Sequence, residues 1–475
     1  PQKEMPMNAR VCLPTRSICA MVVLWTCCVG RAQQAVPGPV IEPWRFQVGA
    51  CTHFSQGKGI LELNLDSLKS AGISAIRDEV PWGAVEQEKD RFQMPEAFET
   101  YVRRAAARRV NVMLILDYGN RLYDDADRPQ SPEAIEGFCR YSEFVVRHFG
   151  KDVRLYEIWN EWDIPIGLPE RHRKPGTPQS YFELLKAVYP RLKAVDPNVT
   201  VIAGASTSGA VKRGWLEEIV KLGALKYCDA ISIHSYNYNE PFPQRGPEAC
   251  SAWMTSVQQM LGRYNGDKDV PFYVTEMGWP THVTKGGTDP ELSASYLARL
   301  YLLARTSDSF EGLWWYDFQD DGWDPKHNED NFGLVRPDLT PKPAYYVMAD
   351  ISQLVGKGRF AGSIETPDEH VQGLRFTREG RDYWTIWSDD DQDRQIVLQT
   401  EHPETPVLVR QLGHDANLVQ WGLRDWAQRR NSELVPNRMS IVVGHRPFML
   451  SGDLSGISIV EAIPRFRQVD RAEQE

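Results

Sequence analysis

Two glutamates in this chain each follow a short apolar run and precede a tryptophan. Glu161 lies in "RLYEIWNEWD" (residues 154–163), and Glu276 lies in "YVTEMGWPT" (residues 273–281). A carboxylate at the end of an apolar segment is costly to bury unless it is hydrogen-bonded, paired or protonated. Two carboxyl groups that face each other across a sugar-sized gap are the groups that hydrolyse a glycosidic bond, because one donates a proton while the other attacks the anomeric carbon.

Other polar and aromatic residues end the neighbouring apolar runs, namely Arg77, Asp117, Tyr118, Asn160, His234, Tyr236, Trp314 and Trp315. Arg77 could hold Glu276 ionised, Tyr236 could donate a hydrogen bond to it, and desolvation would raise the pKa of Glu161. A helix-pairing role for Arg77 and a structural role for His234 are the alternatives, and strand alternation admits only one of the two tryptophans. No set of His, Asp and Glu residues indicates a catalytic metal, and no cofactor is expected.

The elements that must position these residues form a repeated pattern within residues 43–356. Eight apolar runs, each followed by an amphipathic helical stretch, occupy residues 46–51, 73–80, 111–119, 153–161, 199–206, 229–237, 270–279 and 311–318. The runs are continuously apolar, which is typical of parallel strands buried on both faces. Eight such units favour a (β/α)8 TIM barrel over a doubly wound sheet. The barrel would place all the polar strand ends at one mouth, where the catalytic groups of such barrels lie.

Residues 357–475 have a different pattern, in which short alternating segments are separated by charged turns. We predict a β-sandwich accessory domain for them, so that the fold class is an α/β TIM barrel followed by a C-terminal β-sandwich. The acidic turn "SDDDQD" (residues 388–393) lacks the full ligand spacing of a calcium loop. A solvated turn is the simpler interpretation of its composition.

Residues 1–32 have the composition of a leader segment. Arg10 and Arg16 precede an apolar run at residues 17–30, and small residues follow it. This order is that of an export signal, and the run is shorter than the roughly 20 apolar residues that span a bilayer. We therefore expect an exported protein, in the periplasm, at the cell surface or outside the cell, without stable membrane insertion. A retained anchor and a lipid-modified Cys27 are the alternatives.

The composition narrows the choice of partner. The 475 residues are 42% hydrophobic and 25% charged, with a formal net charge of -10 and 15 tryptophans. The chain has no long run of Lys and Arg, which argues against a nucleic-acid partner because phosphate binding depends on clustered cations. Indoles offer rigid apolar platforms for sugar rings, and the charge balance favours a neutral polysaccharide. The oligomeric state is not predicted.

Several motifs resemble those of a known clan of enzymes. "WNE", "HSY" and "TEMGW", with a tryptophan-bearing eighth strand, resemble the retaining (β/α)8 glycoside hydrolases of clan A. The segments "IRDEVPWGAVEQEKDRF" (residues 76–92) and "NFGLVRPDLTPKPAYY" (residues 331–346) are similar to glycoside hydrolase family 39 and its bacterial relatives, which include hydrolases of the Psl-type exopolysaccharide. The resemblance spans residues 44–350. Several clan families carry a histidine near the end of strand three, where this chain has "LDYGN".

The resemblance implies a role for each matching residue. Glu161 would be the acid/base and Glu276 the nucleophile of a retaining glycosidase. Asn160 would bond the 2-hydroxyl of the sugar, Arg77 and Tyr236 would orient Glu276, and His234 and Trp315 would line the subsite. The expected reaction is hydrolysis of O-glycosidic bonds in a polysaccharide or oligosaccharide, with a bacterial exopolysaccharide as one candidate. A cellulase- or mannanase-like member of the clan, a transglycosylase and a non-catalytic carbohydrate-binding barrel are the alternatives.

Overall fold

The computed structural model describes residues 45–390, 392–403, 407–413, 419–421 and 437–465, which pack as one compact unit. The predicted leader, residues 1–32, lies outside the described residues. Among the helices of the described part, none is both long enough and apolar enough to cross a membrane.

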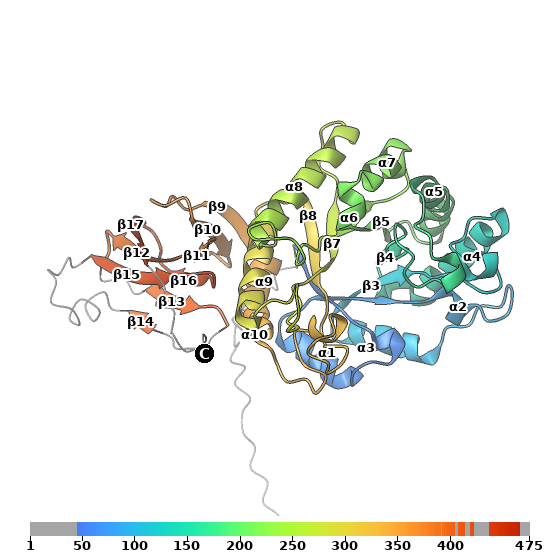
Figure 1. Cartoon of the computed structure of the whole chain (residues 1–475), viewed down its shortest axis with the longest axis horizontal. Helices are drawn as coiled ribbons and strands as arrows, with labels where there is room; N and C mark the ends of the chain where they lie inside the picture. The colour runs from blue at the N-terminus through green and yellow to red at the C-terminus, as the bar shows by residue number, and fades with distance from the viewer. Residues whose placement is uncertain (1–44, 391, 404–406, 414–418, 422–436, 466–475) are drawn as a thin grey trace, which may run out of the picture. The chain divides into compact units, whose positions relative to one another are not determined.

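Eight parallel strands close into a barrel, in chain order around the ring (Figure 1). They are β1 (Gln47–Cys51), β2 (Ala75–Glu79), β3 (Asn111–Leu116), β4 (Leu155–Ile158), β5 (Thr200–Thr207), β6 (Ala230–His234), β7 (Phe272–Met277) and β8 (Phe310–Trp315). The predicted TIM barrel is therefore confirmed.

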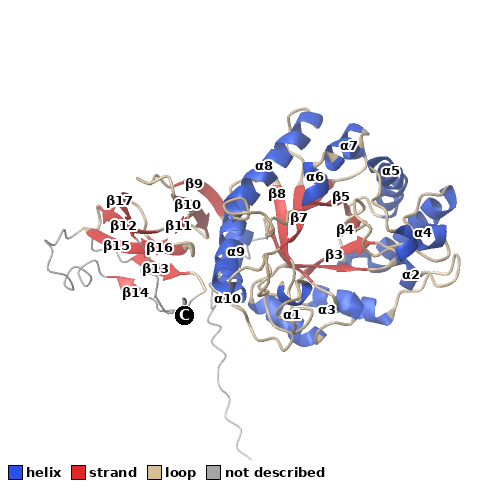
Figure 2. Cartoon of the chain, in the orientation of Figure 1, coloured by secondary structure: helices blue, strands red, loops and turns tan. Residues whose placement is uncertain are grey.

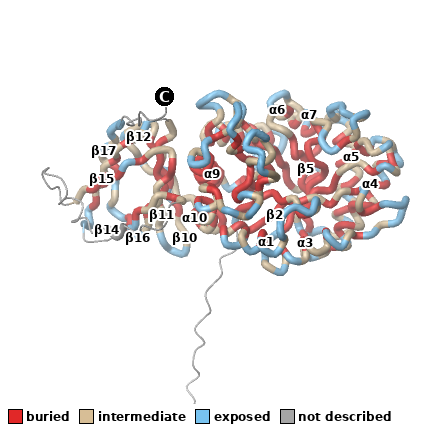
Figure 3. The backbone as a smooth tube through the Cα atoms, turned by 60° about the horizontal axis from the view of Figure 1, so that its bottom comes forward, coloured by how far each residue is buried: buried red, intermediate tan, exposed pale blue. Residues whose placement is uncertain are grey.

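Helices surround the strands, as Figure 2 shows. They are α1 (Leu61–Ser70), α2 (Trp82–Val85), α3 (Glu96–Ala107), α4 (Pro132–Phe149), α5 (Pro178–Val195), α6 (Ser208–Lys212), α7 (Trp215–Lys221), α8 (Pro247–Tyr264), α9 (Pro290–Ala304) and α10 (Pro343–Lys357). The barrel strands are almost wholly buried (Figure 3). This burial on both faces is the physical reason for their continuously apolar sequences.

The residues after α10 form two antiparallel sheets, which confirms the predicted β-sandwich. One sheet has the order β14-β13-β16-β11-β10-β9 and the other the order β15-β12-β17. Buried side chains from both sheets share an apolar core. The strands are β9 (Arg359–Ser363), β10 (Val371–Arg378), β11 (Arg381–Ser388), β12 (Asp393–Thr400), β13 (Val407–Gln411), β14 (Val419–Trp421), β15 (Arg438–Val443), β16 (Phe448–Gly452) and β17 (Ile457–Arg465).

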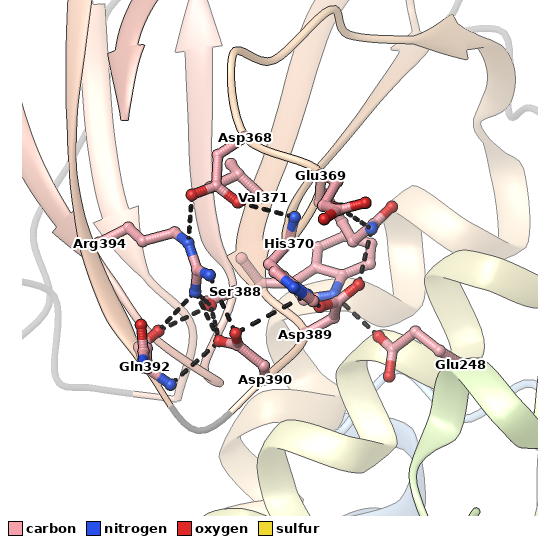
Figure 4. Close-up of polar contacts among 12 residues, drawn as sticks. Glu248, Asp368, Glu369, His370, Val371, Ser388, Asp389, Asp390, Gln392 and Arg394 are labelled. Atoms are coloured by element: carbon pink, nitrogen blue, oxygen red, sulfur yellow. Dashed lines mark hydrogen bonds and ion pairs between the residues drawn. The ribbon is translucent and has the colours of Figure 1, made fainter. Parts of the chain in front are cut away.

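An arginine pairs with one carboxylate of the acidic turn between β11 and β12. Arg394 is buried, and its guanidinium lies 2.5 Å from Asp390 and 2.7 Å from Asp368 (Figure 4). Its Nη1 also donates to the hydroxyl of Ser388 at 2.7 Å. The prediction of a solvated turn therefore missed this ion-pair network. In the network, the guanidinium of Arg394 supplies positive charge that a bound cation would otherwise bring.

Candidate active site

A cavity of about 600 Å³ lies at the carboxyl ends of the barrel strands. Both glutamates singled out in the sequence line it, and each is buried, with 8% of Glu161 and 9% of Glu276 exposed. One side-chain oxygen of each glutamate and one ring nitrogen of His234 lie within 4.8 Å of one another. Strands four, six and seven thus bring three separate sequence motifs to a single point.

Two side chains donate hydrogen bonds to the carboxylate of Glu276. Arg77 Nη1 donates to Oε1 at 2.7 Å, and the hydroxyl of Tyr236 donates to Oε2 at 2.9 Å. Arg77 is 3% exposed, and its Nε also donates to the buried Glu157 at 2.7 Å. Its Nη2 donates to Asn160 Oδ1 at 2.9 Å. Arg77 therefore fixes the positions of a carboxylate and an amide at the base of the cavity.

His234 lies between the two glutamates. Its Nδ1 is 2.7 Å from Glu161 Oε1 and 3.4 Å from Glu276 Oε2. Its Nε2 lies 3.4 Å from Arg77 Nη2. Both carboxylates are acceptors, so Nδ1 carries a proton that faces them, and their negative charges raise the pKa of His234 against the effect of burial.

The two glutamates have opposite pKa shifts. Burial raises the pKa of Glu161 above its usual value, although its hydrogen bond from His234 opposes this. Burial also acts on Glu276, but the charges of His234 and Arg77 and the hydrogen bond from Tyr236 outweigh it and lower the pKa. One carboxyl group thus favours its protonated form while its neighbour favours the ionised form, which is the division of an acid and a nucleophile.

Irregular backbone turns both glutamates into the cavity. Trp159 and Glu161 have φ values of 67° and 48°, in the left-handed region that non-glycine residues rarely adopt. On β7, Tyr273 faces the barrel interior, so strict alternation would turn Glu276 outward. A register shift between Val274 and Met277 in the pairing with β8 interrupts this alternation. The sequence carries no glycine or proline at these points that would have indicated either feature.

The structure does not place Trp315 at the cavity. Its indole N–H donates to the backbone oxygen of Phe332 at 3.1 Å, and the ring packs in the apolar layer outside the strands. Strand alternation sends its neighbour Trp314 into the barrel interior, beneath the cavity. The aromatic lining comes from other residues, Tyr118, Tyr236, Tyr238, Tyr316 and Phe332. Of these, Tyr118 and Tyr236 were among the residues that the sequence places at the ends of its apolar runs.

Two groups of residues in the described part have the side-chain types that bind metal ions. One is Glu161, His234 and Glu276, and the other is His53, Asp317 and Asp321. Neither group forms a sequence motif, because each joins residues that lie far apart in the chain. In the second group His53 lies 2.9 Å from Asp321, and Lys58 lies 2.6 Å from the same carboxylate. The positive side chains therefore offset the carboxylates in that group.

Solved glycoside hydrolases share this architecture. A family 39 glycoside hydrolase from Bacteroides cellulosilyticus WH2 matches with a TM-score of 0.68 and 24% identity, over 86% of this chain and 81% of that chain. This chain has the fold of a family 39 glycoside hydrolase. The resemblance noted in the sequence motifs is therefore confirmed at the level of the fold.

Two further structures extend the comparison. A GH39 enzyme from Xanthomonas axonopodis pv. citri has a TM-score of 0.58 at 16% identity, over 87% of this chain and 94% of that chain. A monomeric β-xylosidase from Caulobacter crescentus CB15 has a TM-score of 0.57 at 15% identity, over 89% of this chain and 98% of that chain. No protein-family model matches the chain, and no curated protein matches its sequence.

Proposed function

We propose that this protein is a retaining glycoside hydrolase that cleaves O-glycosidic bonds in a polysaccharide or oligosaccharide. The proposal rests on one observation, the approach of Glu161 and Glu276 to within 4.8 Å through their side-chain oxygens. Carboxyl groups stand about 5–5.5 Å apart in retaining enzymes and about 6.5–9.5 Å apart in inverting ones, which need room for a water molecule. The separation here supports double displacement.

The reaction follows from the two protonation states. Glu276 attacks the anomeric carbon through a carboxylate oxygen while Glu161 gives its proton to the departing glycosidic oxygen, and a covalent glycosyl ester forms on Glu276. Glu161, now ionised, takes a proton from water as the water attacks the same carbon. The ester bond breaks, and Glu276 leaves as a carboxylate. Arg77, Tyr236 and His234 hold that carboxylate in place.

The nucleophile assignment is tested by rescue with azide. Glu276→Ala should abolish turnover, and azide should restore it by attacking the anomeric carbon directly, with inverted configuration in the glycosyl azide. Glu240→Ala is the matched control, because Glu240 also lines the cavity but is paired with Lys212 at 2.8 Å. Full activity in Glu276→Ala, or no rescue in a variant that is folded, would show that Glu276 is not the nucleophile.

For the substrate we propose a bacterial exopolysaccharide, on the strength of the motifs shared with family 39 relatives. Two structures similar to this chain are described as a β-xylosidase and a GH30 endoxylanase. Xylan, cellulose and mannan oligosaccharides therefore belong in the same panel as the exopolysaccharides and aryl glycosides. Release of reducing ends from exopolysaccharide alone supports the proposal, and release only from the plant polysaccharides overturns it.

We further propose that the protein is exported, with residues 1–32 as the signal. The support is the order of basic, apolar and small residues in this segment. Cell fractionation and N-terminal sequencing of the mature protein test it. We expect a mature chain that begins near residue 33 outside the cytoplasm, and an uncleaved chain confined to the cytoplasm would contradict export.

A further inference from the structure

The walls of the active-site cavity carry more acidic than basic side chains. Six carboxyl groups and two bases line it, the acids being Asp78, Glu79, Glu161, Glu240, Glu276 and Glu329 and the bases Arg77 and His53. Both bases are already paired, Arg77 with Glu157 and Glu276, and His53 with Asp321. The described lining therefore offers no unpaired positive charge to an acidic sugar.

Glu79 differs from the other carboxyl groups of the lining outside the catalytic pair. Asp78 accepts bonds from Thr52 and from the backbone of Phe54. Glu240 is paired with Lys212, and Glu329 accepts a bond from Tyr316 at 3.0 Å.

In contrast, the Glu79 carboxylate has no hydrogen bond or ion pair to the described residues, since only its backbone N–H and oxygen make such bonds.

The position of Glu79 on its strand directs it toward the sugar. It follows Arg77 by two residues on β2, so both side chains face the barrel interior. Arg77 bonds Glu276 at the base of the cavity, and Glu79 lies about 7 Å further along the strand toward the mouth. A ring whose anomeric carbon meets Glu276 would therefore bring its other substituents toward Glu79.

The surroundings of Glu79 are strongly acidic. Burial raises its pKa to about 7, the charges of Asp78 and Glu276 add to the increase, and those of His53 and Arg77 oppose it. Asp117, which also interacts with Glu79, is fully buried, and neither of its carboxyl oxygens has a hydrogen-bond partner in the described part of the chain. A positive charge in the cavity would favour the ionised form of Glu79 and relieve this repulsion.

We propose that the cavity accepts a sugar with a free amino group and that Glu79 recognises its ammonium. The inference rests on the proposed glycosidase function for the position of the sugar ring. It revises the expectation of a neutral polysaccharide, because the charge of the cavity lining, rather than that of the whole chain, acts on the substrate. Sugars with a carboxylate or sulfate group are disfavoured by the same charges.

Monosaccharides test the proposal without turnover, because they contain no glycosidic bond. Ligand-observed NMR titration of the wild-type protein compares glucosamine, galactosamine and mannosamine with the parent hexoses and with the N-acetyl derivatives. At least one amino sugar should bind about tenfold more tightly than both of its uncharged counterparts, which is the size of one charge-assisted hydrogen bond. If no amino sugar exceeds its counterparts, the proposal is wrong, and this arm requires no variant.

Two variants then assign the preference to a residue. Glu79→Gln should abolish the preference for the amino sugar, whereas Glu240→Gln, which changes a lining carboxylate that already has a lysine partner, should retain it. An undiminished preference in a folded Glu79→Gln protein would remove Glu79 from the proposal.

The glycosidase proposal and the amino-sugar proposal fail separately. A protein that cleaves no glycoside refutes the glycosidase, while a binding preference for amino sugars stands or falls without any cleavage.

Discussion

Tyr236 provides a sharp test of how the site sets the charge of Glu276. Its hydroxyl donates to Glu276 Oε2 at 2.9 Å, in a buried setting. Tyr236→Phe removes this donor and leaves the ring in place. A hydrogen bond to a charged group contributes about 1.5–3 kcal/mol, which corresponds to about a 10- to 100-fold change in the equilibrium between ionised and protonated carboxyl. The pKa of Glu276 is held low in the wild type, and it should therefore rise in Tyr236→Phe.

The pH dependence of kcat/KM reports this change. The nucleophile must be ionised, so activity is lost as pH falls through the pKa of Glu276, and the acid limb should move to higher pH in Tyr236→Phe. Tyr238→Phe is the matched control, because Tyr238 lines the same cavity and its hydroxyl contacts Asn328 rather than a catalytic glutamate. Superimposable acid limbs for wild type and Tyr236→Phe, or an equal shift in Tyr238→Phe, would refute the reasoning.

Two further predictions concern the stability of the barrel. Gly49→Ala should lower the free energy of unfolding by about 1–3 kcal/mol, because the new Cβ would lie 2.4 Å from the Trp314 ring. Gly83→Ala is the control, because its new Cβ would lie 3.7 Å from its nearest neighbour, the backbone oxygen of Gly119. It should leave Tm unchanged or raise it, and an equal loss of stability in both variants would contradict the packing argument. Arg77→Met should lower the free energy of unfolding, measured with urea, by about 3–5 kcal/mol, because the buried carboxylates of Glu157 and Glu276 lose their partner. An unchanged urea midpoint would show that other donors satisfy Glu157.

Much of the barrel follows from the sequence because its strands are continuously apolar and end in polar residues. That pattern places Glu161 and Glu276 at one mouth without any knowledge of the loops. Contacts that depend on the register between neighbouring strands cannot be predicted from this pattern. The approach of His234 to both glutamates accompanies a register shift between Ile233 and His234, and the orientation of Glu276 accompanies another on β7. Neither shift leaves a mark in the local composition.

The aromatic lining shows a second limit of the sequence. The resemblance to family 39 implied that Trp315 lines the subsite, yet strand alternation turns it outward and Tyr316 lines the cavity instead. Phe332 reaches the cavity from a loop, and Glu79, two residues after Arg77 on β2, was not among the predicted site residues. Glu79 becomes distinctive only once its neighbours are known, because its carboxylate has no hydrogen-bond or ion-pair partner among the described residues.

The central claim is that Glu161 and Glu276 act on a single sugar, one as acid and one as nucleophile. Proton NMR of the product in the first minutes of cleavage tests it most directly, before the released sugar mutarotates. Two successive displacements at the anomeric carbon predict a first-formed product with the same anomeric configuration as the substrate. A first-formed product of inverted configuration would contradict the account.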